Sequence, residues 1–193
     1  MATLTPQHPT RFDATHVVTS DVESLSQRAF DGCIALPHRM PKPRVQGLTF
    51  VLDKGMSELY MQDYLEDVAP YIDLVKLGWG TSRLFRTERL RTKIEILRNY
   101  DIRVSPGGTL MELAVVQNCV PGFLREVAAL GFTCVEVSDG TIEMSHTDKL
   151  HLIRAARQAG LDVVSEVGKK SPVEDRNLQM DARIDSVRII SRN

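Results

Sequence analysis

Short apolar runs alternate with longer amphipathic stretches along most of the chain, beginning near residue 47. In the longer stretches, such as residues 56–71, apolar side chains recur every three or four positions, which predicts helices. The apolar runs are rich in β-forming residues and predict strands; they cover residues 48–53, 72–78, 101–105, 133–139 and 161–168. Successive runs begin about 25–30 residues apart, a spacing typical of strands joined by crossover helices. The pattern therefore predicts an α/β fold with a parallel sheet.

The remaining helices are predicted from the same periodicity and from the signals at their ends. They cover residues 87–100, 109–117, 123–131 and 145–160, and residues 118–122 are expected to form a longer connection. Gly131 and Gly160 each follow an apolar helical stretch and precede a strand, as helix-ending glycines do. Two further helices are predicted outside this series, a short one at residues 21–30 and an amphipathic one at residues 181–193.

Two architectures fit this strict alternation, an open doubly wound sheet and a closed (β/α)8 barrel. The length of 193 residues favours the open sheet, since a complete barrel usually takes about 250 residues. The chain ends inside the predicted helix at residues 181–193, however, which favours a barrel cut short after about five βα units. We therefore predict a TIM-barrel-type domain at residues 47–193, incomplete at its C-terminus. Residues 1–46 hold five of the nine prolines and are predicted to form a partly irregular N-terminal extension.

Composition and charge place the chain among ordinary globular proteins. Apolar residues make up 42% and charged residues 25%, and the net charge of −1 provides no field that would attract nucleic acid or an acidic membrane. The apolar runs are too short to span a bilayer. The N-terminus lacks a secretory signal, and Cys33, Cys119 and Cys134 are spaced as reduced thiols rather than as a zinc site or a disulfide framework. These features predict a cytoplasmic protein.

Residues with candidate chemistry follow the predicted strands at one end. Because the carboxyl ends of parallel strands meet at one edge of a sheet, we expect these side chains to converge. Four lysines would create a local positive field suited to a small polyanion, such as a phosphorylated carboxylate. They are Lys54, Lys76, Lys169 and Lys170. Several carboxylates could hold Mg²⁺, which prefers oxygen ligands. They are Asp53, Glu136, Asp139 and Glu166.

These positions also have purely structural interpretations. Lys76 lies within an apolar strand, where burying an ammonium group is costly, so a functional role is favoured there. Glu166, Lys169 and Lys170 could instead form a local ion-pair network. The PGGT stretch at residues 106–109 could present backbone N–H groups to an anion, or it could serve only as a tight turn.

Five motifs give the chain a resemblance to a known family. They are GLTFVLDKG, YIDLVKLGWGTS, PGGTLMELA, GFTCVEVSDGTIEM and EVGKKSP, in this order between residues 47 and 180. The chain resembles the phosphosulfolactate synthase family, which includes the archaeal enzyme of coenzyme M biosynthesis and related plant heat-stress-associated proteins. The resemblance implies a (β/α)8 barrel and a Mg²⁺-dependent addition of sulfite to phosphoenolpyruvate, giving (2R)-phospho-3-sulfolactate.

The resemblance also implies roles for the residues at the strand ends. Lys170 would be the general acid that protonates C2 of the substrate, and Lys169 is the second candidate. The substrate-binding set would comprise Lys54, Lys76, Ser82, Gly107, Gly108, Thr109 and Ser138. The Mg²⁺ ligands would be Glu136, Glu166 and Asp53.

Alternative functions stay open at the level of the sequence. Strands six to eight of a barrel have no counterpart in the predicted series, so the chain could be an inactive fragment or could need a second copy of itself to complete a barrel. A non-catalytic, stress-associated family member is one alternative. An aldolase-type barrel enzyme with a Schiff-base lysine in EVGKK is a weaker one. The expected partners are phosphoenolpyruvate and sulfite, and neither nucleic acid nor a membrane.

Overall fold

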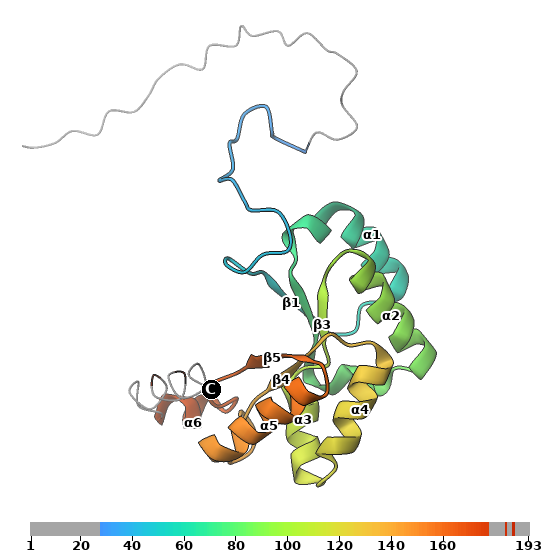
Figure 1. Cartoon of the computed structure of the whole chain (residues 1–193). Helices are drawn as coiled ribbons and strands as arrows, with labels where there is room; N and C mark the ends of the chain where they lie inside the picture. Colours follow the sequence, from blue (N-terminus) through green and yellow to red (C-terminus); the bar gives the residue numbers. More distant parts are fainter. Residues whose placement is uncertain (1–27, 178–183, 185–186, 188–193) are drawn as a thin grey trace, which may run out of the picture. The chain divides into compact units, whose positions relative to one another are not determined.

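The computed structural model describes residues 28–177, together with residues 184 and 187 (Figure 1). The helix predicted at residues 21–30 lies largely outside the described residues. The helix predicted at residues 181–193 also lies largely outside them, although the two described positions there are helical.

The chain divides into two units, Met1–Arg39 and Met40–Asn193. In the first unit, the described residues 28–39 form turns and irregular chain. The second unit contains every helix and strand found among the described residues. All candidate chemistry from the strand ends therefore lies in the second unit.

Five parallel strands form the framework of the second unit, as the apolar runs predicted. They are β1 (Phe50–Asp53), β2 (Leu74–Leu77), β3 (Arg103–Ser105), β4 (Cys134–Val137) and β5 (Asp162–Ser165). Parallel pairing joins β1 to β2, β2 to β3, and β4 to β5. Between β3 and β4, the backbone N–H of Thr133 donates to the carbonyl oxygen of Val104 at 3.2 Å. The strands therefore lie side by side in the order in which they occur along the chain.

This order bears on the two architectures that the sequence left open. A doubly wound sheet reverses its strand order at a switch point, whereas the order here runs from β1 to β5 without reversal. The strands described do not close on themselves, since β1 and β5 are not paired. The structure thus establishes an α/β fold with parallel strands, and closure into a (β/α)8 barrel stays a prediction.

Helices follow the strands and cover one side of them; Figure 1 shows α1, α2 and α4 on that side. Their bounds are α1 (Glu58–Val68), α2 (Thr87–Asn99), α3 (Gly108–Val116), α4 (Val120–Leu130), α5 (His146–Gln158) and α6 (Pro172–Asn177), with 3₁₀ turns η1 (Ala69–Tyr71) and η2 (Gly78–Leu84). Ser57 and Ser145 cap α1 and α5 by accepting backbone hydrogen bonds. Among the described residues, no helix combines the length and the apolar character needed to cross a bilayer.

One predicted boundary is wrong. Residues 118–122 were expected to form a connection, but α4 already begins at Val120. Pro121 lies in the first turn of this helix, where its fixed φ angle fits and its missing N–H costs no hydrogen bond. The proline is therefore part of the first turn of the helix.

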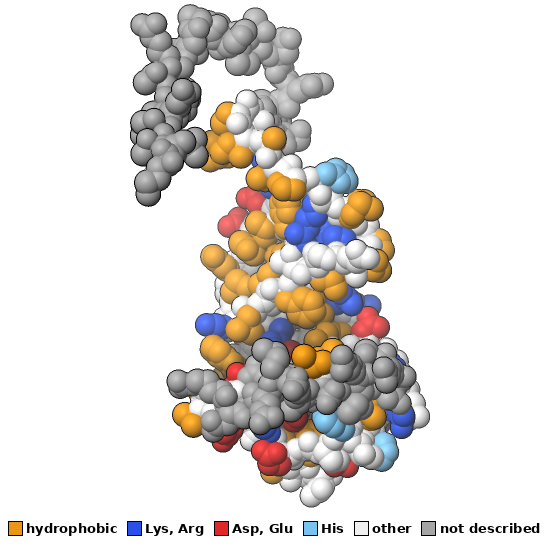
Figure 2. Space-filling view, turned by 90° about the vertical axis from the view of Figure 1, so that its left-hand side faces the viewer, with side chains coloured by type: hydrophobic (Ala, Val, Ile, Leu, Met, Phe, Trp, Pro, Cys, Tyr) orange, Lys and Arg blue, Asp and Glu red, His pale blue; other side chains and the backbone are white. Residues whose placement is uncertain are grey.

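The core lies between the strands and the helices. Val75, Val104 and Val135 project from three neighbouring strands and are at most 2% exposed. They pack with apolar side chains from the helices, including Ile94 of α2 and Val127 of α4. On the other face of β1, Phe50 and Leu52 are exposed. Figure 2 shows hydrophobic side chains gathered on one face of the molecule. The helices therefore bury one face of the strands, and polar side chains gather at the carboxyl ends.

Candidate active site

A lysine and two glutamates meet where β2, β4 and β5 end. The Nζ atom of Lys76 in β2 lies 2.8 Å from Oε2 and 3.1 Å from Oε1 of Glu136 in β4. Glu166 directly follows β5, and its carboxyl lies near enough to that of Glu136 for the two to interact electrostatically. The lysine side chain keeps 28% exposure and that of Glu136 only 7%, so the pair lies at the edge of the fold. The sequence placed these residues at a shared strand edge, and the structure brings them together.

Gly107 and Gly108, at the start of α3, also pack against this pair. The backbone N–H of Gly108, the first residue of the helix, donates to Oε1 of Glu136 at 2.9 Å. A Cβ atom at Gly108 would collide with Oγ of Ser138 and would lie 2.7 Å from Glu136 Oε1. Gly107 has φ near +80°, a conformation that favours glycine. The PGGT stretch is therefore more than a tight turn, because it holds the helix end against a carboxylate.

Glu166 has a neighbour of like charge and an unsatisfied oxygen. Burial raises the pKa of its carboxyl, and the adjacent Glu136 raises it further, whereas the ammonium groups of Lys76 and Lys170 act in the opposite direction. Its Oε2 atom is buried and has no hydrogen-bond partner among the described residues. Two close carboxylates with a free oxygen are a suitable ligand set for a divalent cation.

Lys170 reaches the same edge from the loop after β5. Its Nζ atom lies 3.2 Å from Oγ1 of Thr109 in α3 and 3.6 Å from Oε1 of Glu112. The side chain is 29% exposed, so the ammonium group can exchange protons with solvent. Lys170 also donates its backbone N–H to the carbonyl oxygen of Gly140 at 2.8 Å.

Glu112 is a buried carboxylate that the sequence analysis missed. It is 1% exposed and accepts hydrogen bonds from the hydroxyl groups of Ser138 and Thr141 and from the backbone N–H groups of Gly140 and Thr141. Burial would raise the pKa of the Glu112 carboxyl, but the hydrogen bonds from Ser138 and Thr141 outweigh burial and hold that pKa below its ordinary value. The charge of Lys170 acts in the same direction. The one available signal was a charged residue on the apolar face of a predicted helix.

Asp53, the third of the expected metal ligands, has partners of its own. Its carboxylate binds Nζ of Lys93 at 2.7 Å and accepts from the N–H groups of Gly55 and Met56 at 2.6 and 2.7 Å. Both Asp53 and Lys93 are almost fully buried. Within the part of the chain that the structure describes, no three His, Cys, Asp or Glu side chains are grouped to hold a metal ion.

Several other predicted residues have structural partners of their own. Lys54 lies over the ring of Trp79, with Nζ 4.6 Å from the ring centroid. Lys169 donates to the carbonyl oxygens of Asp139 and Ile142 at 3.0 and 2.9 Å, which ties the loop after β5 to the loop after β4. The hydroxyl of Ser138 is used by Glu112. Both lysines also form ion pairs, Lys169 with Glu143 at 3.0 Å and Lys170 with Glu112 at 3.6 Å.

The side chains of Asp139 and Ser82 also have other partners or surroundings than the pair formed by Lys76 and Glu136. The Asp139 carboxylate binds Nζ of Lys149, a buried lysine of α5, at 2.7 Å. Ser82 lines a largely apolar cavity of about 390 Å³ between η2, α2 and α4, and none of the lysines and glutamates at the strand ends lines that cavity.

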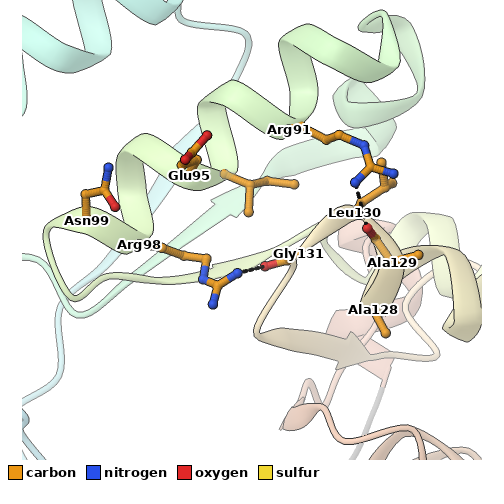
Figure 3. A pocket seen from close by; sticks show the side chains of 9 residues that line it. Arg91, Glu95, Arg98, Asn99, Ala128, Ala129, Leu130 and Gly131 are labelled. Atoms are coloured by element: carbon orange, nitrogen blue, oxygen red, sulfur yellow. Dashed lines mark hydrogen bonds between the residues drawn. The ribbon is translucent and has the colours of Figure 1, made fainter.

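A second groove lies on the opposite edge of the fold. It has a volume of about 730 Å³ and runs between the carboxyl ends of α2 and α4, next to the starts of strands (Figure 3). Arg91 donates to the carbonyl oxygen of Ala129 at 2.9 Å, and Arg98 donates to that of Gly131 at 3.5 Å. These arginines satisfy carbonyl groups that the end of α4 leaves without helical partners. The two arginines that line this groove therefore have a structural role in capping α4.

The cysteines take no part in the site. Cys134 is buried in β4, and burial raises the pKa of its thiol to about 11. Cys33 and Cys119 are exposed, and all three thiols are free. Because a thiol of high pKa is a poor nucleophile, Cys134 serves packing.

Comparison with known proteins assigns the sequence to a family. The chain matches the family model of (2R)-phospho-3-sulfolactate synthase over residues 37–190. The chain belongs to the phosphosulfolactate synthase family. This confirms the resemblance drawn from the five motifs, and the match covers every strand-end residue discussed above.

Individual members of the phosphosulfolactate synthase family show how far the likeness extends. A phosphosulfolactate synthase of Methanothermobacter thermautotrophicus is 42% identical over 83% of this chain, and one of Methanocaldococcus jannaschii is 42% identical over 72% of it. The chain spans 61% and 55% of the length of these two relatives. The protein HEAT-STRESS-ASSOCIATED 32 of Arabidopsis thaliana is 24% identical over 64% of the chain and 44% of its own length.

Among solved structures, the carboxyl transferase domain of Rhizobium etli pyruvate carboxylase is similar, with a TM-score of 0.48 and 15% identity. The likeness covers 74% of this chain and 26% of that one. A TM-score of this size is too low to support an argument about barrel closure. The assignment to the synthase family rests on the sequence match alone.

Proposed function

We propose that this chain carries the active-site edge of an enzyme that adds sulfite to phosphoenolpyruvate and forms (2R)-phospho-3-sulfolactate. The observation that carries the proposal is the group formed by Lys76, Glu136, Glu166 and Lys170 in a member of the synthase family. Cationic groups and carboxylates meet there at the carboxyl ends of parallel strands, where ligands of α/β folds bind.

The reaction has one demanding feature. The sulfur atom of sulfite forms a bond to C3, and the electron pair of the C2–C3 double bond moves toward C2 and the carboxylate. The resulting species resembles an enolate and carries additional negative charge, which fixed cations and N–H groups stabilise. A proton must then reach C2 from one face to complete the product. The protein therefore has to supply positive charge and one well-placed acid.

Lys76 and the start of α3 are suited to the first task. The Lys76 ammonium and the N–H of Gly108 both donate to the Glu136 carboxylate. The Lys76 side chain keeps 28% exposure, so its ammonium group can also donate to a carboxylate or phosphate of the substrate. Lys54 and Ser82, by contrast, have other surroundings and are left out of the proposed site.

Lys170 is the best candidate for the acid. Its nearest anion, Glu112, already accepts four hydrogen bonds from the loop after β4, so the ammonium group keeps donors for a substrate. Its partial exposure would allow the transferred proton to be replaced from solvent. Lys169 is a weaker candidate, because its ammonium group is held by two backbone carbonyls.

Glu136 and Glu166 fit the Mg²⁺ ion that the family implies. The unpartnered Oε2 atom of Glu166 and the raised pKa of its carboxyl both point to a missing positive charge between the two glutamates. Two carboxylates suffice, since Mg²⁺ usually keeps waters and substrate oxygens as its other ligands. When bound, Mg²⁺ would act as a Lewis acid toward the charge that develops on the substrate carboxylate.

The test is the consumption of phosphoenolpyruvate with and without sulfite, and with and without Mg²⁺. Since the chain spans 61% of the length of the M. thermautotrophicus relative, it should be assayed beside that full-length synthase. We expect loss of phosphoenolpyruvate only when sulfite and Mg²⁺ are both present. Consumption that does not depend on sulfite would contradict the proposal, and so would complete inactivity at high protein concentration, where a second copy could complete the site.

A non-catalytic role is less well supported. Identity to the two archaeal synthases is 42%, against 24% to the heat-stress-associated protein. A protein without catalysis would also have no need to keep the carboxylate of Glu166 next to that of Glu136, because the repulsion between them is unfavourable.

A further inference from the structure

Gly140, in the loop between β4 and α5, leaves a space that the Lys170 side chain fills. A Cβ atom built on Gly140 would lie 2.8 Å from Cγ, 3.0 Å from Cε and 3.2 Å from Cδ of Lys170. Real side chains essentially never approach a Cβ atom at the first of these distances. The backbone of Gly140 does not adopt positive φ, so its conformation alone does not require glycine. The absence of a side chain at this position therefore serves the packing of Lys170.

The backbone of Gly140 holds Lys170 and Glu112 as well. Its carbonyl oxygen accepts the N–H of Lys170 at 2.8 Å, and its own N–H donates to Oε1 of Glu112 at 2.9 Å. The same Oε1 atom lies 3.6 Å from the Lys170 ammonium. One residue therefore fixes the main chain of the lysine, makes room for its aliphatic stem and anchors the anion beside its charge.

We propose that Gly140 is a positioning residue for Lys170, with Glu112 as the anionic anchor. The space at Gly140 guides the lysine stem so that its ammonium group reaches Thr109 at the start of α3. The catalytic consequence rests on the proposed function, in which Lys170 donates the proton to C2. The positioning itself does not depend on that function.

The direct variant is Gly140→Ala. The atoms in its way belong to a flexible side chain, so the lysine stem is expected to move while the backbone stays in place. A displacement on the order of 1 Å should lower kcat by about 10- to 100-fold. The KM for phosphoenolpyruvate should change by less than about twofold, because a misplaced acid impairs the transition state more than substrate binding. A rise in KM that accounts for the whole loss would overturn the proposal.

Gly122→Ala is the matched control. Gly122 lies in α4, and the nearest atom to a Cβ there is Nη2 of Arg125 at 3.9 Å, which is ordinary contact. This variant should keep both activity and stability. It separates the effect of adding a methyl group from the effect of displacing Lys170.

A double-mutant cycle shows whether Gly140 acts through Lys170. Lys170→Ala removes the stem that the new methyl group would displace, so Gly140→Ala should cost nothing further in that background. The double variant is therefore expected to have the activity of Lys170→Ala alone. Losses that multiply would mean that Gly140 supports the loop independently, which would overturn the inference.

Chemical labelling tests the positioning without any turnover. Acylation of Lys170 by an amine-directed reagent is followed by mass spectrometry, with the exposed Lys54 as internal reference. Release from Thr109 and Glu112 should accelerate labelling of Lys170 by about two- to fivefold in Gly140→Ala, as expected for loss of a partly exposed ion pair. Gly122→Ala should label like the wild type. An unchanged rate in Gly140→Ala would overturn the inference.

These measurements separate the inference from the proposed function. An inactive wild type would refute the proposed function, whereas the labelling ratio would still decide whether Gly140 positions Lys170. If Gly140→Ala does not fold, Glu112→Gln provides the second variant, because it removes the anchoring charge and leaves Gly140 in place. Lys170 should then also label faster, and an unchanged rate would again contradict the inference.

Discussion

The end of β1 and the ends of β4 and β5 both combine an acid with lysines, yet they form opposite environments. At β1, Asp53 is saturated by Lys93 and two backbone N–H groups, and both charged side chains are at most 1% exposed. At β4 and β5, Lys76 from the neighbouring β2 and Lys170 from the loop after β5 keep 28% and 29% exposure of their side chains. The first pair is closed to any ligand, whereas the second group is open to one.

This difference shows what separates a structural ion pair from a candidate site. A closed pair satisfies both partners and contributes to the stability of the loop that it holds, although burying it has a large desolvation cost. The open group keeps an unpartnered oxygen on Glu166 and ammonium donors at its edge. Unsatisfied charge that the fold maintains is the signature of a ligand site. Four variants would break or sharpen this contrast.

The largest effect is expected for Lys170→Ala. Loss of a general acid typically lowers the rate by about 10²- to 10⁴-fold, so kcat should fall within that range. The measurement is steady-state kinetics of sulfite-dependent phosphoenolpyruvate consumption. Arg89→Ala, which removes an exposed partner of Glu58, serves as control and should leave kcat unchanged. A Lys170→Ala enzyme within threefold of the wild type would remove this residue from the mechanism.

The next effect is on stability, at the closed pair. Lys93→Ala leaves the buried Asp53 carboxylate without its cation and should lower the free energy of unfolding by about 3–5 kcal/mol. Urea denaturation followed by circular dichroism measures this loss. Arg89→Ala breaks an exposed pair instead and should cost only about 0–1 kcal/mol. Equal costs for the two variants would show that the pair at β1 is not closed to solvent.

Glu112→Gln should have an intermediate effect that depends on pH. At pH 7 the amide can satisfy fewer of the four donors, and the free energy of unfolding should fall by about 1–3 kcal/mol. The folded state lowers the pKa of Glu112, so its stabilisation is present above the ordinary value of 4.5 and is lost as pH falls through the lower folded value. The difference between variant and wild type should therefore shrink below pH 4.5. A difference that stays constant with pH would refute the charged role of Glu112.

The smallest effect concerns metal binding at the open group. Mg²⁺ at ten times its dissociation constant should stabilise the folded protein by about 1.4 kcal/mol and raise Tm accordingly. Glu166→Gln should abolish this increase, because it removes one of the two proposed ligands. Glu143→Gln is the matched control, since the Glu143 side chain is 94% exposed. An equal rise in Tm for wild type and Glu166→Gln would place the ion elsewhere.

Much of the framework could be predicted from the pattern of residues. All five strands and the helices between them lie where the periodicity placed them, apart from the early start of α4 at Val120. Local physics explains this success, because side-chain periodicity and helix-end signals act within a few residues. The convergence of Lys76, Glu136 and Glu166 could also be anticipated, since parallel strands bring their carboxyl ends together.

The buried charges could not be predicted in the same way. Lys93, Glu112 and Lys149 lie in amphipathic helices, where a charged residue is normally expected to face solvent. Each has its partner on another element, at a separation in sequence that no periodicity encodes. The place of Asp53 at a strand end suggested a metal ligand. Its partner in the structure is Lys93 of α2, and that contact forms only when α2 packs against β1.

The sequence by itself determined the βα series, the family and the edge of the sheet on which charged residues gather, because these depend on local periodicity and on ordered motifs. The tertiary structure alone decided which charges stay available. Asp53 is paired with the buried Lys93, and Lys169 donates to backbone carbonyls. Lys170, by contrast, extends past Gly140 toward Thr109. The physical reason is that the energy of a charge depends on its partners and its distance from water, and both are fixed only when distant segments pack together.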